Sequence, residues 1–237
     1  MVDNQIVRVK VAGDYACFTR PDLKVERMTY PCMTPSAARG ILDSILWKPE
    51  FQWYVRRILV LNPVKFASVK RNEINSKQGR NVIVIEERRS QRNSIILKDA
   101  AYIIEASVYQ EPFSEKNPPR KYVEMFRRRV KKGQCWRRPY LGTREFAAEF
   151  TDVDDGDAPI CETIPIGSML FDVFYNEQGA CEPVFFYDVA VINGVLNCEV
   201  PENDKMMMSS HLRPQQDSIV SSAVYDFNIS EEREVDQ

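Results

Sequence analysis

The stretch TPSAARGILDSILWKPEFQWYVRRILVL, residues 34–61, predicts a helix followed by a strand. Thr34 is a favourable N-cap and Pro35 suits the first helical position, so we expect the helix to begin there. Lys48-Pro49 is expected to end it near Trp47. Its apolar positions recur at helical spacing: Ala38, Ile41, Leu42 and Ile45. The β-branched and aromatic residues at 51–61 then predict a strand.

Strands and a second helix are expected on both sides of this unit. Residues 5–18 alternate apolar and polar side chains, which is typical of a half-buried strand. Further expected elements are strands at 64–69, 82–85, 101–109 and 144–150, a polar loop at 72–80, and a helix from a cap at Asn117 to Gly133. The order predicts an α+β, ferredoxin-like (RAMP/RRM-like) fold with helices on one face of an antiparallel sheet.

The chain is expected to divide into three parts. Residues 1–151 form the ferredoxin-like domain, and an acidic turn at 152–157 follows it. Strands at 169–175, 185–192 and 195–200 predict a small antiparallel β domain over 158–201, its last two strands joined by a type I′ turn at Asn193-Gly194. Residues 202–237 lack periodicity, so a weakly ordered acidic tail is expected.

Charge is divided unequally along the chain. Residues 1–150 contain 29 Lys and Arg against 16 Asp and Glu, whereas residues 151–237 contain 3 against 18. The densest stretch, residues 120–145, holds ten basic residues and two acidic ones. A strongly basic half predicts a polyanionic ligand, RNA or DNA.

The second helix is the main candidate for binding. Its stripe of Val123, Phe126 and Val130 is expected to face the sheet, which turns the basic side chains outward to neutralise phosphates. Trp136 and Tyr140 either stack on bases or pack the loop 133–142 onto the sheet. The candidate RNA-binding residues are Arg120, Arg127, Arg128, Lys131, Lys132, Trp136, Arg137 and Arg138, with the loop glycines Gly133 and Gly142. A solvated charged helix is the alternative.

Several classes of protein are excluded by the sequence. Six cysteines without a CxxC pair, and a single histidine, His211, do not match the common zinc spacings. No P-loop, Rossmann glycine pattern or GxSxG motif is present. No apolar run approaches the roughly 20 residues that span a bilayer, and the N-terminus lacks a signal-peptide core. We therefore expect a cytoplasmic protein with no membrane span, metal or cofactor.

Four segments together resemble one known family. They are GDYACFTRPDLKVERMTYPCMTPSAARGILDSILWKP at 13–49, RNE at 71–73, LKDAAY at 97–102, and KYVEMFRRRVKKG…PYLGTREF at 121–146. The chain is similar, across most of residues 5–200, to the CRISPR-associated Cas-five proteins of type I-C systems, the Dvulg subtype.

The resemblance implies a function and its partners. It implies a metal-independent endoribonuclease that cuts CRISPR repeat RNA (pre-crRNA) by attack of the RNA's own 2′-hydroxyl, leaving a 2′,3′-cyclic phosphate. The protein then stays on the 5′ handle of the crRNA, beside the backbone and large subunits of the type I-C interference complex. No cofactor is implied.

The resemblance also implies where catalysis occurs. Family members use a Tyr late in the first helix and a Lys-His pair at the start of the second, and these positions match Leu46, Lys121 and Tyr122. Lys121 and Tyr122 are therefore the expected catalytic residues. A tyrosine with a pKa of ~10 would donate a proton, or act as a base if neighbouring cations lower its pKa. The alternative for Tyr122 is packing under the loop.

Three functions remain open from the sequence. The first is the processing endoribonuclease. The second is a non-catalytic subunit that binds the 5′ handle of the crRNA. The third is a general duplex-binding protein that also binds double-stranded DNA, because cationic contacts to phosphates carry no sequence information.

Overall fold

The structure, a computed structural model, describes residues 6–23, 25–76, 79, 82–110, 117–175 and 181–199. Its elements in chain order are β1 (Ile6–Ala16), α1 (Pro35–Ile45), β2 (Phe51–Val60), β3 (Lys65–Ile74), α2 (Ile85–Arg88), β4 (Arg89–Gln110), α3 (Pro119–Lys131), β5 (Glu149–Thr151), β6 (Ile164–Tyr175), β7 (Cys181–Val191) and β8 (Val195–Asn197). In this part of the chain, no helix is long and apolar enough to cross a membrane.

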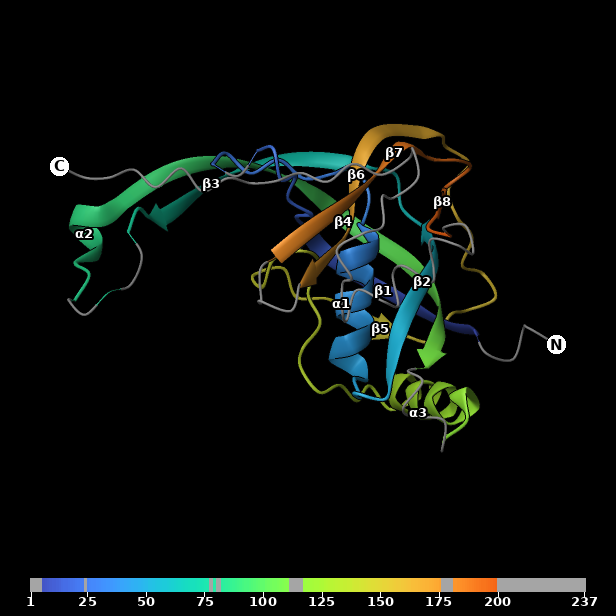
Figure 1. Cartoon of the computed structure of the whole chain (residues 1–237). Coiled ribbons are helices and arrows are strands. Elements are labelled where there is room, and N and C mark those ends of the chain that lie inside the picture. The colour runs from blue at the N-terminus through green and yellow to red at the C-terminus, as the bar shows by residue number, and fades with distance from the viewer. Residues whose placement is uncertain are drawn as a thin grey trace, which may run out of the picture.

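The main sheet has the strand order β5-β1-β4-β2-β8, and all its neighbouring strands are antiparallel (Figure 1). Along the chain, β1, α1, β2, β4, α3 and β5 follow the βαββαβ order of a ferredoxin-like fold. The α+β, ferredoxin-like prediction is confirmed.

One face of this sheet carries the core against α1 and α3. Val7, Val9 and Val11 of β1 are fully buried, and the predicted apolar stripes of both helices are buried in the same core. The predicted cap of α1 is confirmed, because Thr34 Oγ1 accepts a hydrogen bond from the Ala37 N–H at 3.2 Å. The predicted cap of α3 is wrong: Pro118 takes that position.

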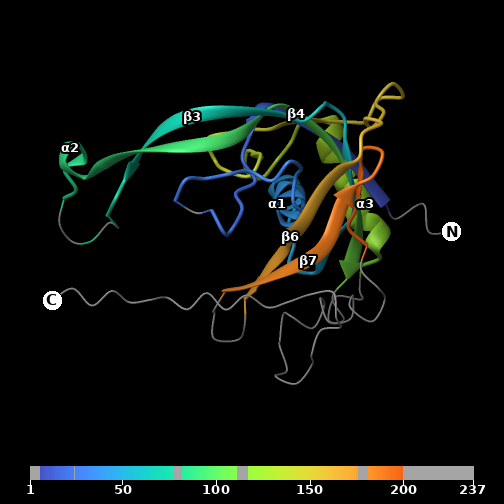
Figure 2. The same cartoon turned by 90° about the horizontal axis from the view of Figure 1, so that it is seen from above.

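Strand β3 and the first half of β4 form a two-stranded arm that reaches away from the sheet and ends in α2 (Figures 1 and 2). The sequence predicted a strand at 82–85 and a start of β4 only at 101, and both predictions were wrong. The loop predicted at 72–80 was wrong for residues 72–74, which belong to β3, whereas Asn75 and Ser76 lie outside any helix or strand. In the arm's outer part, exposed residues alternate with half-buried ones, but the half-buried positions include polar residues such as Arg71, Glu73 and Arg92. The sequence there therefore lacks the apolar alternation that marks a half-buried strand.

The C-terminal strands divide between two sheets. Strands β6 and β7 form a separate ribbon that packs on α1, so this helix lies between the ribbon and the main sheet (Figure 2). The predicted turn is present, with φ of 49° at Asn193 and 74° at Gly194. Strand β8 nevertheless pairs with β2, and β5 is shorter than predicted. The predicted boundaries of the ferredoxin-like domain, 1–151, and of the small β domain, 158–201, stay predictions. The acidic tail predicted at 202–237 lies outside the described residues.

Candidate nucleic-acid interface

Helix α3 presents a basic face to solvent. Its buried side is formed by Tyr122, Val123, Phe126 and Val130. The exposed basic side chains of the helix and its C-cap are Arg120, Lys121, Arg127, Arg128, Lys131 and Lys132. Arg120 pairs with Glu124 at 2.8 Å. Within the described residues, Arg128, Lys131 and Lys132 have no carboxylate at ion-pair distance, so their charge is available to a ligand.

The loop 133–142 continues this basic face to the end of α1. The backbone N–H groups of Trp136 and Arg137 both donate to the Ser44 carbonyl, at 2.8 and 3.1 Å. Arg129 of α3 donates to the Ile45 carbonyl at 2.5 Å. The side chains of Trp136, Arg137 and Arg138 are exposed. The predicted binding residues of the helix and the loop therefore form one surface.

The two loop glycines have positive φ angles. Gly133, with φ of 61°, ends α3, as glycines at this position commonly do. Gly142 has φ of 85°, and a Cβ added there would overlap the backbone carbonyl of Cys17. The N–H of Cys17 also donates to the Leu141 carbonyl at 3.0 Å. Only glycine permits this close contact, which fixes the end of the loop against the end of β1.

Two cavities border the basic surface. One, of about 340 Å³, lies between α1 and the loop, where Ser36, Gly40, Arg138 and Tyr140 contribute to its lining. Tyr140 is 40% exposed, so its ring is partly available to a ligand. The other, of about 620 Å³, is lined by Ile6, Arg8, Arg57, Glu105, Arg127, Lys131, Asp152 and Val153.

The second cavity contains arginines that the sequence interpretation missed. Glu105, whose side chain is only 7% exposed, pairs with Arg8 at 3.0 Å and with Arg57 at 2.6 Å. Arg8 lies between the buried Val7 and Val9 along β1. The alternation in the sequence therefore already indicated that the Arg8 side chain is on the face of the sheet opposite the core. Arg57 follows a register shift in β2, which the sequence pattern did not reveal.

The expected catalytic residues lie in different environments. Lys121 is exposed, and its Nζ donates to Asn117 Oδ1 at 2.9 Å. The Tyr122 ring is 2% exposed and packs on Phe51, with ring centroids 4.6 Å apart. Leu46, at the other family position, is also fully buried. Of these three positions, only Lys121 presents a polar group to solvent in this conformation.

The Tyr122 hydroxyl is buried without a hydrogen-bond partner among the described residues. Because such a group has lost its water contacts without compensation, Tyr122→Phe is expected to stabilise the protein by about 1 kcal/mol. Urea unfolding measures the change. Tyr30→Phe is the matched control, since the Tyr30 hydroxyl accepts from the Leu170 N–H at 3.3 Å and its loss should be destabilising. Destabilisation by Tyr122→Phe would contradict this account.

A cluster of one arginine and two carboxylates joins α1 to β6. The Arg39 guanidinium holds Asp172 of β6 by two hydrogen bonds of 2.7 Å and reaches Asp43 at 3.4 Å. Burial raises the pKa of Asp43 to about 6; Arg39 and Arg137 oppose this rise, and Asp172 adds to it. Sequence reasoning missed this group, although Asp43 follows Arg39 by one helical turn.

The raised pKa makes stability depend on pH. Folded Asp43 holds its proton up to about pH 6, whereas the unfolded residue releases it near 3.8, so the free energy of unfolding falls as pH rises between these values. Asp43→Asn, which mimics the protonated acid, should therefore be more stable than the native chain at pH 8, by about 3 kcal/mol, and nearly equal to it at pH 4. Thermal unfolding at both pH values tests this. An equal effect at both would contradict it.

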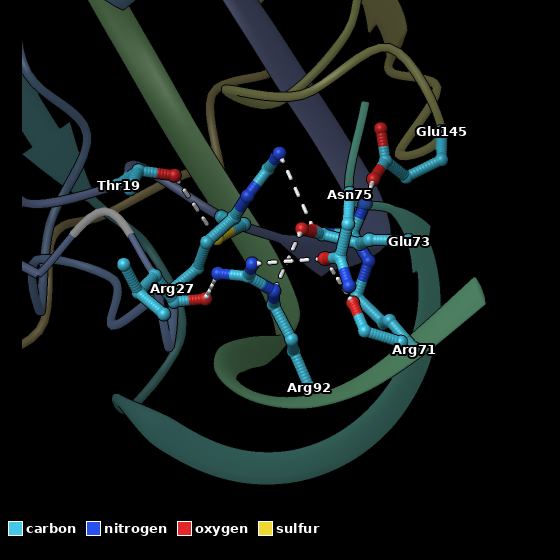
Figure 3. Close-up of polar contacts among 10 residues, drawn as sticks. Thr19, Arg27, Arg71, Glu73, Asn75, Arg92 and Glu145 are labelled. Atoms are coloured by element: carbon cyan, nitrogen blue, oxygen red, sulfur yellow. Dashed lines mark hydrogen bonds and ion pairs between the residues drawn. The ribbon is translucent and has the colours of Figure 1, made fainter. Parts of the chain in front are cut away.

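Ion pairs connect the outer half of the arm to the segments that contain Arg27 and Glu145 (Figure 3). Arg71 of β3 pairs with Glu145, which follows the loop in sequence. Glu73 forms ion pairs with Arg27 at 3.4 Å and with Arg92 of β4 at 3.7 Å. The segments RNE and PYLGTREF, which are far apart in sequence, therefore meet in the structure.

In the described part of the chain, no group of three or more His, Cys, Asp or Glu residues is arranged to hold a metal ion. Among the described cysteines, Cys17, Cys32 and Cys198 are buried, and Cys135 and Cys161 are exposed. All five have free thiols.

Comparison with known sequences identifies close relatives. A family model described as CRISPR-associated protein (Cas_Cas5) matches residues 6–212. The CRISPR pre-crRNA endoribonuclease Cas5d of Thermus thermophilus is 48% identical over 181 residues, covering 76% of this chain and 78% of the relative. The protein of the same name from Mannheimia succiniciproducens is 40% identical over 213 residues, covering 81% and 93%.

Solved structures share the fold. A crystal structure of a CRISPR-associated protein superposes with a TM-score of 0.63 at 22% identity, covering 83% of this chain and 92% of that one. A functionally uncharacterized protein from Streptococcus mutans gives a TM-score of 0.62 at 20% identity, covering 84% and 94%. At these identities the likeness shows the fold alone.

Proposed function

The chain belongs to the Cas5 family of CRISPR-associated proteins, and we propose that it binds CRISPR repeat RNA and cuts it as an endoribonuclease. The resemblance noted in the sequence is confirmed at the level of the family. The two relatives named pre-crRNA endoribonucleases support the activity.

The observation that carries this proposal is the continuous basic surface from α3 through the loop 133–142. Arg128, Lys131 and Lys132 lack ion-pair partners among the described residues, and Arg137 and Arg138 extend the surface toward α1. Lysines and arginines that neutralise phosphates release counterions, which favours RNA binding at low salt.

The proposed chemistry is an internal transesterification. The 2′-oxygen forms a bond to the adjacent phosphorus while the bond from phosphorus to the 5′-oxygen breaks. The 2′-hydroxyl proton goes to a base, and the leaving 5′-oxygen gains a proton from an acid. Lys121 would stabilise the charge on the phosphorane oxygens or protonate the leaving oxygen. A catalytic role for Tyr122 requires its side chain to turn out of the core.

A second candidate function is a non-catalytic subunit that binds the 5′ handle of crRNA. The burial of Leu46 and Tyr122 favours it, because neither family position presents a titratable group to solvent. In either case we propose a cytoplasmic protein that joins the backbone and large subunits of a type I-C interference complex.

One reaction distinguishes these functions. The purified chain is incubated with a repeat hairpin RNA in EDTA, and the mixture is analysed on native and denaturing gels. A bound complex with a shortened RNA supports the endoribonuclease, and a bound complex with intact RNA supports the second candidate. Unrelated double-stranded DNA that displaces the hairpin at equal concentration would favour the general duplex-binding protein and overturn both.

A further inference from the structure

Two of the three tryptophans in this chain are exposed. Trp47 is 60% and Trp136 is 74% exposed, whereas Trp53 is 3% exposed. Trp53 lies in the core, where its Nε1 donates to the Leu46 carbonyl at 2.9 Å and its ring contacts Phe126. Large aromatic surfaces left in water are unfavourable, so two exposed indoles indicate a binding site when they lie together.

Both exposed tryptophans lie at the C-terminal end of α1. The backbone nitrogen of Trp136 lies 2.8 Å from the carbonyl oxygen of Ser44, to which it donates a hydrogen bond. Trp47 follows Ser44 by three residues, which span at most ~10 Å. Leu46 has an extended backbone and a fully buried side chain. Because side chains alternate along extended backbone, Trp47 points away from the core.

The surroundings of this helix end are cationic. Arg137 is next to Trp136, and its backbone N–H also donates to the Ser44 carbonyl. Lys48 follows Trp47 in the sequence. Arg129 reaches the Ile45 carbonyl. Two acids lie in the same region: Asp43, which is paired with Arg39, and Glu50. Among the described residues, neither exposed indole stacks on another aromatic ring, so their faces are available.

We infer that Trp47 and Trp136 form a stacking site for unpaired bases of the bound RNA. Indole faces stack on any base, and the adjacent arginines hold the phosphates between the bases. An RNA strand fits this combination better than a protein partner, because cations outnumber acids around the two indoles. The inference rests on the proposed function, and it adds a single-stranded segment of the RNA to the surface formed by α3.

Tryptophan fluorescence tests the site directly, since base stacking quenches indole emission. The probe is an unstructured RNA decamer of mixed sequence at low salt, with the full chain. Titration should quench the native protein, and Trp47→Phe and Trp136→Phe should each lose part of this quenching. The double variant, which retains only the buried Trp53, should lose nearly all of it.

Affinity for the same decamer gives a second measurement. The variant with both Trp47→Ala and Trp136→Ala should bind about ten- to a hundredfold more weakly. Its affinity for a blunt RNA duplex should change by less than about twofold. Phe66→Ala, which removes another exposed aromatic ring from β3, is the matched control and should leave both affinities unchanged.

The outcomes separate this inference from the proposed function. Salt-sensitive RNA binding without quenching, and with unchanged affinity in the double alanine variant, overturns the stacking site while the proposed function stands. An equal loss of affinity for the decamer and the duplex also overturns it. If neither the decamer nor the repeat hairpin binds at any salt concentration, the proposed function fails and the stacking site fails with it.

Discussion

Lys121→Ala is expected to lower the rate of repeat-RNA cleavage by about a hundredfold or more. Lys121 is exposed at the start of α3, and its ammonium group is the one polar group that the three family positions present to solvent. A group that donates a proton, or stabilises developing charge, contributes about 10²- to 10⁴-fold to such a rate. RNA affinity should fall by less than about fivefold, because the other cations of the surface remain.

The measurement is single-turnover cleavage with protein in excess, which separates chemistry from binding. Arg120→Ala is the matched control: it removes a neighbouring cation that is already paired with Glu124, and it should change the rate by less than about threefold. Lys121→Arg keeps the positive charge but donates a proton poorly. A cleavage rate near the native one would therefore indicate that Lys121 stabilises charge on the phosphorane oxygens, and a low rate would indicate that it protonates the leaving oxygen. Cleavage undiminished in Lys121→Ala would exclude Lys121 from the reaction.

Reversing two charges on α3 and its C-cap, Arg128→Glu with Lys132→Glu, is expected to weaken repeat-RNA binding by about a hundredfold at low salt. Each reversal removes a phosphate contact and adds repulsion. The slope of log K against log salt should also become shallower by about 1.4 to 1.8, since each of the two contacts contributes about 0.7 to 0.9. Filter binding across several salt concentrations measures both quantities.

The control for this variant changes the same amount of charge on another element. Lys70→Glu with Lys98→Glu reverses two exposed lysines on β3 and β4 and should weaken binding by less than about fivefold. Similar losses in both variants would show that only net charge matters. In that case the surface of α3 and the loop would not be the RNA interface.

The sequence predicted the parts of the fold that form the core. The alternation in β1 and the stripes of α1 and α3 were visible because each element buries one side. The arm was not visible, because pairing between β3 and β4, rather than burial, holds residues such as Lys70 and Arg92 in extended conformation. The pairing of β8 with β2 depends on contacts distant in sequence, which local patterns do not encode.

The exposure of the candidate site residues was predicted in part. The basic residues of α3 and the loop are exposed, as their spacing indicated, and their role in RNA binding stays a prediction. Tyr122, Phe126 and Val130 are spaced four residues apart, so the buried position of Tyr122 was already present in the helical stripe. The grouping of Trp47 with Trp136 depends on the docking of the loop onto Ser44, which no sequence pattern predicted.

The central claim is that this chain cuts repeat RNA through the RNA's own 2′-hydroxyl, without a metal ion. The most direct test uses a repeat hairpin with a single 2′-deoxy nucleotide immediately 5′ of the scissile phosphate, incubated with the chain in EDTA. We predict unchanged binding and no cleavage at that position, while the all-RNA hairpin is cut to a product with a 2′,3′-cyclic phosphate. Cleavage of the deoxy-substituted hairpin at the same position would contradict the account.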